Sequence, residues 1–456
     1  MKRPLRLLVI GGVAAGTKAA AKARRDDPTM EITIITQEEY ISYAGCGLAY
    51  YLGGVVDKRE KLFARSPETF HEKHNINVLL NHRAERINSY DRTVKVINLL
   101  SGENLTIPYD RLLIATGSSP VILPIEGVDS QGIFTLHTIP DADSIINYIN
   151  NRNVHNACIV GGGYIGVEAA ENLVLKGISC TLFEVENHLM PKFFDADMSE
   201  SVREHMKSKG VQVITGNAVE KFKSNSEDCV TSVFSDGKDY ECQLVILATG
   251  VRPNVQLARD ARITIGSTGG IKVDRRMETS MRNIFAAGDC VESVNLVTGK
   301  PCWYPLGTTA NKQGRVAGAN IAGGKKTFEG VVGTSITKVF DITAGRTGLS
   351  EREAKEAGFN PASVTVTTSV SAGYYPGEGS ITLKLIADSG SKILLGAQAV
   401  GDASVDKVID TVAAVLTGKI SIPALTNIDL AYSPPYSSVL GTVITAAGVL
   451  EEKLGL

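Results

Sequence analysis

The sequence predicts an α/β protein with two parallel-sheet units followed by a smaller α+β unit. An apolar run that leads into a glycine-rich turn and then a helical pattern occurs twice, at residues 7–24 and 157–176. Each is followed by an apolar segment that ends in Ala-Thr-Gly, at 112–117 and 244–250. Self-similarity on this scale indicates an internal duplication of a domain. The last part of the chain has no such glycine turn, and apolar and polar residues alternate there.

The bulk composition narrows the class of protein. The 456 residues are enough for about three domains, and a net charge of −2 predicts no surface for nucleic acid or an anionic membrane. Seven cysteines without framework spacing favour a reducing compartment, so we expect a cytoplasmic protein. The apolar run Leu7–Ile10 is far shorter than the ~20 residues that span a bilayer. His71 and His74 have metal-like spacing but are expected on a solvated helix, so no metal site is predicted.

Both parallel-sheet units contain a dinucleotide fingerprint. In the first, the strand Leu7–Ile10 meets the turn Gly11–Gly16 and a second strand follows at Ile32–Ile35; in the second, Ala157–Val160 meets Gly161–Gly166. Glycine lets the backbone approach a pyrophosphate, and the following helix offers N–H groups and the positive end of its dipole. Because each fingerprint stands between a strand and a helix, the sequence predicts two Rossmann-like domains that each bind a dinucleotide.

The two units differ at the end of their second strand. Glu184 ends that strand in the second unit, where a carboxylate hydrogen-bonds a ribose 2′-OH and repels a 2′-phosphate. The next four residues include no Arg or Lys, so NADH is favoured, with NADPH possible. In the first unit the same position is Thr36, followed by Gln37. Either Gln37 substitutes for the missing carboxylate or that ribose is held differently.

The rest of the chain forms two further passages. Residues 279–324 contain the apolar segment Asn283–Asp289 and then a glycine- and alanine-rich helix. Beyond them, the alternating stretches 363–367 and 381–385 predict antiparallel strands, and 402–418 predicts a helix that Gly418 ends. This last passage is the α+β unit.

In their order along the chain, these motifs resemble the pyridine nucleotide-disulfide oxidoreductases over essentially the whole length. The two fingerprints, both Ala-Thr-Gly segments and the segment from Thr279 to Asp289 carry the resemblance. It implies FAD on the first unit and on residues 279–324, NADH or NADPH on the second unit, and a C-terminal dimerisation domain that makes the protein a homodimer. The implied domains are 1–148 and 273–330 for FAD, 149–272 for NAD(P)H and 331–456 for dimerisation.

The resemblance also assigns cofactor contacts. It implies that Asp289 binds the ribityl chain of FAD, that the backbone of Ala84 contacts adenine, and that Tyr164 covers the nicotinamide pocket, with Glu168 one helical turn further on. The other implied cofactor-binding residues, including Glu184, lie on the turns and on the Ala-Thr-Gly and Gly-Asp segments: Gly11, Gly12, Ala14, Ala15, Gly16, Ser42, Ala115, Thr116, Gly117, Gly161, Gly163, Ile165, Gly166, Glu184, Gly250 and Gly288.

One cysteine follows the second strand of the first unit, and no other cysteine lies near it in the sequence. Cys46 lies in Ser42–Gly47, and the next cysteine in the chain is Cys158, which excludes Cys-x-x-Cys and Cys-x₄-Cys pairs. Its surroundings resemble the single-cysteine branch of the family, which holds coenzyme A-disulfide reductases, persulfide or polysulfide reductases, NADH oxidases and NADH peroxidases. Oxidases and peroxidases of this branch carry a histidine where this chain has Ala14, which disfavours peroxide chemistry.

The C-terminal unit carries two tyrosine–proline segments, Tyr374–Gly377 and Tyr432–Tyr436. Both resemble segments of coenzyme A-linked members, and the likeness implies that Tyr374 and Tyr432 reach the partner subunit's Cys46 and complete the active site. The choice between the two tyrosines of each segment stays open. By the same likeness, three basic residues are expected to bind the nucleotide phosphate of coenzyme A: Lys22, Arg25 and Lys73.

The predicted function is therefore an FAD-dependent oxidoreductase that uses NADH to reduce coenzyme A disulfide, persulfide or polysulfide through Cys46. Attack requires the thiolate, and residues 47–51 suggest a helix start that would lower the pKa of Cys46. One alternative is an NADH oxidase that reduces oxygen. Another is an electron-transfer subunit that passes NADH electrons to a protein partner. Thr36 and Gly45, where coenzyme A-linked members usually have asparagine, keep both alternatives open.

Overall fold

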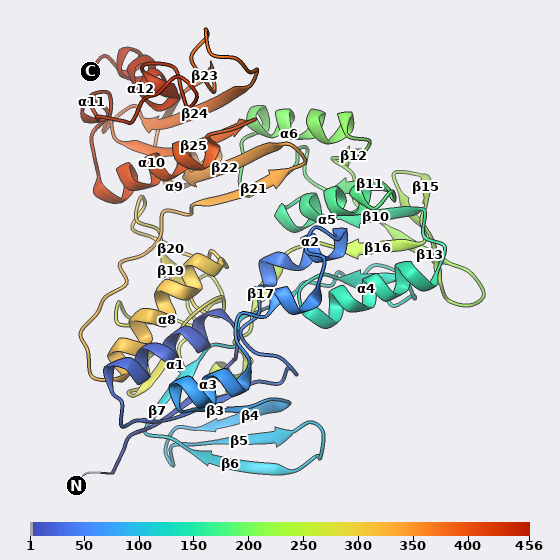
Figure 1. Cartoon of the computed structure of the whole chain (residues 1–456), viewed down its shortest axis with the longest axis vertical. Helices are drawn as coiled ribbons and strands as arrows, with labels where there is room; N and C mark the ends of the chain where they lie inside the picture. Colours follow the sequence, from blue (N-terminus) through green and yellow to red (C-terminus); the bar gives the residue numbers. More distant parts are fainter. Residues whose placement is uncertain (1–2) are drawn as a thin grey trace.

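The computed structural model describes residues 3–456 and shows the first unit built on a five-stranded parallel sheet (Figure 1). The strand order is β18-β7-β1-β2-β3, and every neighbouring pair is parallel. The strands are β1 (Arg6–Ile10), β2 (Glu31–Ile35), β3 (Ile76–Leu79), β7 (Arg111–Ile114) and β18 (Ile284–Ala286). Because β18 comes from the passage after the second unit, the chain leaves the first unit and returns to it.

The second unit repeats this architecture. Its parallel sheet has the order β12-β11-β10-β16-β9, with the central β10 flanked by β11 and β16 as β1 is by β2 and β7. The strands are β9 (Ile133–Thr135), β10 (Asn156–Val160), β11 (Ser179–Glu184), β12 (Gln212–Thr215) and β16 (Leu244–Leu247). The predicted duplication and the α/β class are confirmed.

The helices after the glycine turns are held close to their neighbours by small residues. Helix α1 (Ala14–Asp26) packs on α8 (Gly307–Ile321), and a Cβ on Gly314 would lie 2.4 Å from Ala15 O. A Cβ on Gly318 would lie 2.3 Å from Ala19 O of α1. The glycine- and alanine-rich composition predicted for α8 therefore lets two backbones touch, which fixes the loop before α8 against the first glycine turn.

The C-terminal unit is an antiparallel sheet of order β21-β22-β25-β24-β23. Its apolar face packs against α10 (Val405–Gly418) and α12 (Gly441–Leu454). The strands are β21 (Ser335–Val339), β22 (Ile342–Gly348), β23 (Pro361–Ser369), β24 (Ser380–Asp388) and β25 (Leu394–Gly401). The α+β prediction is confirmed, with one correction: Lys419, at φ 53°, takes the left-handed position after α10, and Gly418 is the last helical residue.

The remaining elements connect or cover these sheets. They are α2 (Leu48–Gly53), α3 (Pro67–His74), α4 (Ile139–Asn151), α5 (Tyr164–Leu175), α6 (Ala196–Ser208), α7 (Gln256–Asp260), α9 (Glu351–Ala357), α11 (Ile422–Leu425), the 3₁₀ turns Gly45–Gly47 and Arg59–Leu62, and the short strands β4 (His82–Asn88), β5 (Thr93–Asn98), β6 (Asn104–Pro108), β8 (Ser118–Pro120), β13 (Lys221–Ser224), β14 (Val230–Ser235), β15 (Lys238–Glu241), β17 (Val251–Pro253), β19 (Ser293–Val294) and β20 (Pro301–Cys302).

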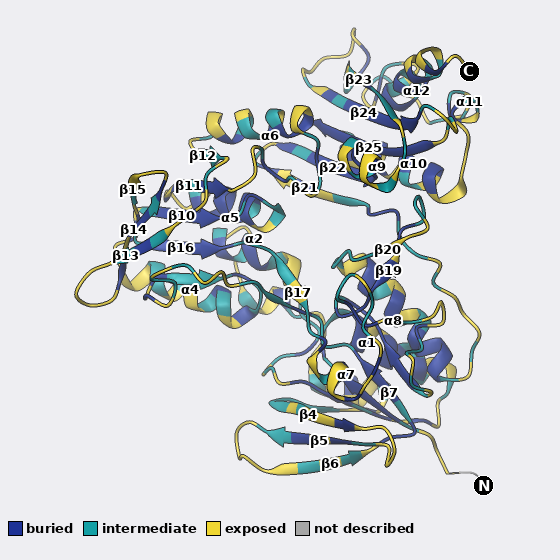
Figure 2. Ribbon diagram, turned by 180° about the vertical axis from the view of Figure 1, so that it is seen from behind, coloured by how far each residue is buried: buried dark blue, intermediate teal, exposed yellow. Residues whose placement is uncertain are grey.

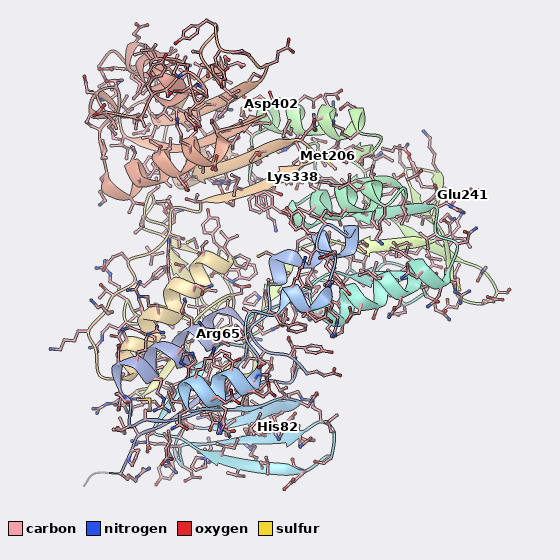
Figure 3. All side chains as sticks on the ribbon, in the orientation of Figure 1. Arg65, His82, Met206, Glu241, Lys338 and Asp402 are labelled. Carbon is pink, nitrogen blue, oxygen red and sulfur yellow. The ribbon has the colours of Figure 1, made fainter. Side chains whose placement is uncertain are left out.

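The three units share packed boundaries, and the central strands of the three five-stranded sheets are buried (Figure 2). The core of the second unit continues into the C-terminal sheet through Val339 and Val400. At the same boundary Lys338 of β21, labelled in Figure 3, lies 2.5 Å from the buried Glu171 of α5. Within residues 3–456, no helix combines the length and the apolar character needed to cross a bilayer.

Candidate active site

A cavity of about 2380 Å³ lies where the three units meet. It is lined by both glycine turns, by the Cys46 loop and by parts of α9 and α10. Pockets for drug-sized ligands are roughly 300–1,000 Å³, so this cavity has room for more than one large ligand. Most of the glycines predicted to bind cofactors line it, whereas the predicted residues Gly16, Ser42 and Gly166 do not.

The first glycine turn forms a cradle that a side chain would fill. Gly11 has φ 115°, and a Cβ there would lie 2.0 Å from Ala115 O. A Cβ on Gly16 would lie 2.0 Å from Gly11 O, so this glycine serves the close packing of α1 on the turn. No described side chain caps α1, and its first turn is free of acidic residues. Its N–H groups are therefore available to a phosphate.

The second turn has the same geometry. Gly161 has φ 111°, and a Cβ on Gly166 would lie 1.9 Å from Gly161 O. Glu184 is buried at the cavity wall, where Gly162 N donates to Oε2 at 2.8 Å and Glu186 N donates to Oε1 at 2.9 Å. These bonds fix the carboxylate at the end of β11, the position from which a ribose hydroxyl is recognised.

The first unit lacks this acceptor, as the sequence indicated. Thr36 is buried and its Oγ1 accepts from Glu38 N at 3.3 Å, while Gln37 is exposed on the cavity wall. Ala84 also lines the cavity, beside an irregularity in the pairing of β4 with β5. Ser42 is held to the turn by its N–H, which donates to Gly12 O at 2.8 Å.

Tyr164 and Glu168 face the cavity from the first turns of α5. The Tyr164 hydroxyl lies 2.6 Å from Ser335 Oγ, and its ring centroid lies 4.1 Å from that of Phe193. Burial raises the pKa of Tyr164 to about 12. Thr337 Oγ1 donates to Glu168 Oε1 at 2.8 Å, and burial raises the pKa of this carboxyl. Both side chains are thus oriented by hydroxyl groups of strand β21.

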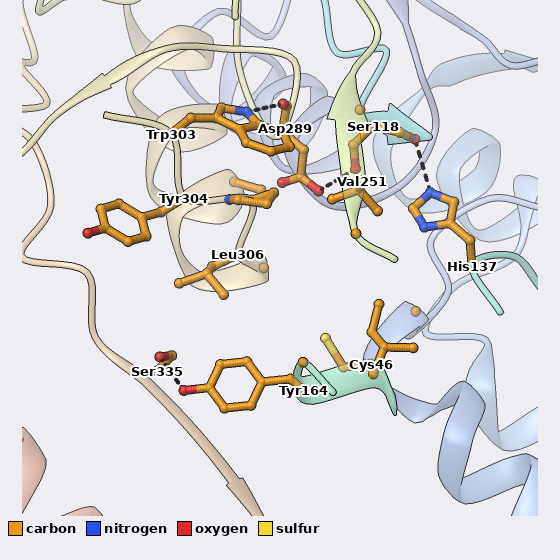
Figure 4. Close-up of a pocket in the computed structure, with 18 of the residues that line it drawn as sticks. Cys46, Ser118, His137, Tyr164, Val251, Asp289, Trp303, Tyr304, Leu306 and Ser335 are labelled. Atoms are coloured by element: carbon orange, nitrogen blue, oxygen red, sulfur yellow. Dashed lines mark hydrogen bonds between the residues drawn. The ribbon is translucent and has the colours of Figure 1, made fainter. Parts of the chain in front are cut away.

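Asp289 faces the cavity from the opposite side (Figure 4). Ser118 Oγ donates to Asp289 Oδ2 at 3.3 Å, and Trp303 Nε1 donates to Asp289 O at 2.8 Å. Burial raises the pKa of the Asp289 carboxyl. His137 Nε2 lies 3.0 Å from Ser118 O, so this nitrogen must carry the proton. His137 was not predicted because it stands in no recognisable motif, and Ser118 was not predicted although it directly follows the Ala-Thr-Gly segment.

Cys46 lies in the 3₁₀ turn Gly45–Gly47 and is exposed, while the other six cysteines, all within the described residues, are buried or half-buried. The loop is anchored by Ala44 N, which donates to Leu62 O at 2.8 Å, and by Ala64 N, which donates to Ser42 O at 2.8 Å. Its sulfur points into the cavity (Figure 4). Cys46 therefore lines the same cavity as the two glycine turns.

The predicted lowering of the Cys46 pKa is wrong. Helix α2 has only six residues and begins two positions after the thiol. Partial burial of the sulfur, and then the carboxylates of Glu168 and Asp289, raise the pKa of Cys46 instead. A like charge nearby disfavours the thiolate. Less thiolate is therefore present at neutral pH than in an ordinary exposed cysteine.

This environment predicts a shifted pH profile for alkylation of Cys46 by iodoacetamide. Because the thiolate is the nucleophile, the rate should rise with pH and level off above the raised pKa. Glu168→Gln removes one negative charge and should move the midpoint to lower pH. Mass spectrometry of the Cys46 peptide in the holoenzyme measures the rate. Glu356→Gln, on the same cavity wall, should leave the midpoint in place, and an unmoved midpoint in Glu168→Gln would contradict the assignment.

The two predicted tyrosines lie outside the cavity wall of their own chain. The Tyr374 and Tyr432 hydroxyls are 3.2 Å apart, and the side chains are 76% and 41% exposed. This contact pairs Tyr374 with Tyr432, whereas Tyr375 and Tyr436 take no part in it. The structure brings the two hydroxyls together on the C-terminal unit but does not bring them to Cys46 within one chain.

The predicted phosphate-binding residues also lie outside the cavity. Lys22 Nζ is 2.6 Å from Asp26 Oδ1 on its own helix. Arg25 of α1 and Lys73 of α3 are exposed and approach His74: burial, then Arg65, Arg25 and Lys73, lower the pKa of this imidazole. Arg65, labelled in Figure 3, precedes α3. Arg65 was not predicted, because nothing in the sequence pairs it with α1.

Two family profiles match the chain. One, described as pyridine nucleotide-disulphide oxidoreductase, matches residues 5–314. The other, described as the dimerisation domain of the same class, matches residues 334–444. The matched residues include both glycine turns, the Cys46 loop and the paired tyrosines.

Similar proteins align along nearly the full chain. A protein of Pyrococcus furiosus named NAD(P)H sulfur oxidoreductase (CoA-dependent) is 38% identical over 447 residues, which cover 98% of this chain and 99% of the relative. An NADH oxidase of Methanocaldococcus jannaschii is 34% identical, with 99% of each chain covered. The solved structure of an NAD-dependent persulfide reductase from A. fulgidus is 42% identical with a TM-score of 0.96, and covers 99% of this chain and 84% of that one.

Proposed function

This chain belongs to the pyridine nucleotide-disulphide oxidoreductase family, and from that premise we propose that it uses NADH to reduce coenzyme A disulfide, persulfide or polysulfide through Cys46. It is an oxidoreductase that uses FAD and NAD(P)H. The observation that carries the proposal is the placement of Cys46: a fixed, accessible thiol on the wall of the cavity that both dinucleotide cradles share.

The residues present fit both dinucleotides. The first turn, Ala84 and Asp289 would hold FAD, and the second turn with Glu184 would hold the nicotinamide nucleotide. When bound, the flavin supplies the capacity to pass two electrons between a nicotinamide and a sulfur. The protein supplies orientation: Gly11 leaves room for a pyrophosphate, and Trp303 and Ser118 hold Asp289 in place.

The sulfur chemistry is assigned to Cys46. Its thiolate attacks one sulfur of the substrate, a new S–S bond to Cys46 forms, the substrate S–S bond breaks, and the second sulfur leaves as a thiolate. Two electrons that originate from NADH then break the mixed disulfide, which releases the first thiol and restores Cys46. The leaving thiolate needs a proton, and a tyrosine hydroxyl is a suitable general acid. We assign this role to the partner subunit's Tyr374 and Tyr432.

The proposal extends to partners and location. Coenzyme A disulfide carries a nucleotide phosphate, for which Arg25 and Lys73 beside His74, and more weakly Lys22, offer positive charge. Lys22 is the weaker contributor because Asp26 already pairs with it.

A homodimer is supported by the dimerisation-domain match. Seven free cysteines are consistent with a reducing compartment, and we propose that the protein is cytoplasmic.

The test is NADH oxidation by the purified holoenzyme with coenzyme A disulfide, with polysulfide and with oxygen alone. We expect rapid turnover with a sulfur substrate under anaerobic conditions and slow oxygen consumption in its absence. Mass spectrometry of the non-reduced protein should also reveal a coenzyme A adduct on Cys46. The similar NADH oxidase of M. jannaschii makes oxygen the second candidate acceptor. Fast oxygen consumption that coenzyme A disulfide does not alter would favour that function and refute ours.

Glu184 gives a test of nucleotide choice. Glu184→Ala removes the carboxylate at the end of β11, so the KM for NADH should rise and the ratio of kcat/KM for NADH over NADPH should fall about tenfold, which corresponds to about 1.4 kcal/mol. Glu186→Ala, two residues further on and exposed, is the matched control. Steady-state kinetics with both nucleotides give the ratio. An unchanged ratio would remove Glu184 from nucleotide selection.

A further inference from the structure

A short segment after β11 joins the second glycine turn to the cavity wall. Met190 N donates to Gly162 O of the turn at 2.9 Å. Met190 O accepts from Phe193 N at 2.8 Å and from Phe194 N at 3.0 Å. Met190 is fully buried at φ 53°, a left-handed conformation that costs free energy in a residue with a side chain. Such a conformation persists only where the surrounding contacts enforce it.

Some of these contacts come from the C-terminal unit. Arg346 of β22 is 1% exposed, and its Nη1 donates to Lys192 O at 2.9 Å. Its Nη2 donates to Glu353 Oε2 at 2.6 Å, which compensates the buried charge. Arg352 Nη2 also donates to Pro191 O, at 2.8 Å. A planar guanidinium can serve several acceptors at once in a fixed geometry, so Arg346 holds the segment and Glu353 together.

The segment in turn supports Tyr164. Pro191, Lys192 and Phe193 line the cavity, whereas Arg346 does not. The centroid of the Phe193 ring lies 4.1 Å from that of Tyr164, at the start of α5. Arg346 therefore acts from behind the cavity wall, on the carbonyl that directly precedes Phe193.

We propose that Arg346 is a positioning residue for the nicotinamide nucleotide: it fixes the carbonyl before Phe193, so that the Phe193 ring supports Tyr164 at the second glycine turn. This rests on the proposed nucleotide site and not on the identity of the sulfur substrate. Without the bond from Arg346 the segment has other conformations available, and the apparent dissociation constant of the nucleotide rises by the inverse of the competent fraction. The C-terminal unit, whose family profile is described by dimerisation, thus also shapes a nucleotide site of its own chain.

The experiment compares two variants with the unaltered holoenzyme. Arg346→Lys keeps the charge beside Glu353 but loses the guanidinium fork. Arg346→Met combined with Glu353→Gln removes both charges, so that no carboxylate is left without its partner. Calorimetric titration with NAD⁺ should give a dissociation constant about fivefold higher or more in both variants, which corresponds to a competent fraction of about one fifth. The KM for NADH should rise by the same factor, while kcat at saturating NADH and the KM for coenzyme A disulfide should stay within about twofold.

Lys384→Met is the matched control. Lys384 is also a buried cation of the C-terminal sheet, and it pairs with Asp195 and Asp197, which follow the segment. Asp195 keeps its two hydrogen bonds to Gln398 in this variant. The Tm should fall, as expected when a buried ion pair is broken, while NAD⁺ binding stays within about twofold. Hydrogen–deuterium exchange at the amide of Phe193 should become faster in both Arg346 variants and not in Lys384→Met.

Two results would overturn the inference. Unchanged NAD⁺ binding in both Arg346 variants would show that the segment needs no support from the C-terminal unit. An equal loss of binding in Lys384→Met would show a general loosening of the boundary between the units. If the unaltered holoenzyme binds no NAD⁺, the proposed nucleotide site itself fails and the inference falls with it, which separates the two cases.

Discussion

Replacing Cys46 by serine should lower the rate of disulfide or persulfide reduction on the order of 10³-fold or more, because removal of a covalent nucleophile eliminates the reaction path. Serine is nearly the same size and the site is exposed, so folding and flavin content should be unchanged. The measurement is anaerobic NADH oxidation with coenzyme A disulfide, together with the flavin absorbance of the purified variant.

Cys302 provides the matched control for this substitution. It also lines the cavity, and burial together with Glu292 raises its pKa to about 12, so it is held as a thiol. Cys302→Ser should keep most of the activity. Sulfur reduction that persists in Cys46→Ser and is lost in Cys302→Ser would show that Cys302 is the nucleophile and would refute the assignment of Cys46.

The fold and the cofactor cradles could be predicted because their causes are local. At Gly11 and Gly161 a positive φ and a carbonyl oxygen within about 2 Å of a hypothetical Cβ leave no alternative to glycine, so the sequence records the geometry directly. The acidic end of β11 is local too, and Glu184 lies where the pattern places it. The family match confirms the α/β class and the FAD and NAD(P)H cofactors.

Other features depend on residues that are distant in sequence. The pKa of Cys46 is raised by burial and then by the carboxylates of Glu168 and Asp289, which belong to the second unit and to the segment that returns to the first unit. The segment that follows Cys46 suggested a helix dipole that lowers the pKa of the thiol, but the helix is short, and burial together with the two distant carboxylates raises this pKa. His137 reaches the cavity only because β9 joins the second sheet beside β16. Sequence patterns carry no record of such juxtapositions.

The pairing of Tyr374 with Tyr432 predicts an active site shared between subunits. Both hydroxyls lie together on the C-terminal unit and away from their own chain's cavity, so the Tyr374→Phe/Tyr432→Phe double variant removes both proton donors while keeping the rings. Loss of a general acid should lower sulfur reduction by roughly 10²-fold. Dimers formed by co-expressing this variant with Cys46→Ser should regain about a quarter of the normal activity, because half of a random mixture is heterodimer and each heterodimer has one intact site.

The recovery distinguishes a partner's contribution from an effect within the chain. If each chain used its own tyrosines, every site in the mixture would lack either Cys46 or both hydroxyls, and mixing would restore nothing. Tyr375→Phe removes a neighbouring hydroxyl that is also exposed but takes no part in the pair, and it should leave the rate within about twofold, since surface substitutions are usually small in effect. A double variant as active as the normal enzyme would show that the leaving thiolate takes its proton from another donor, such as water or Tyr50, whose pKa burial raises to about 12 beside Glu168 and Cys46.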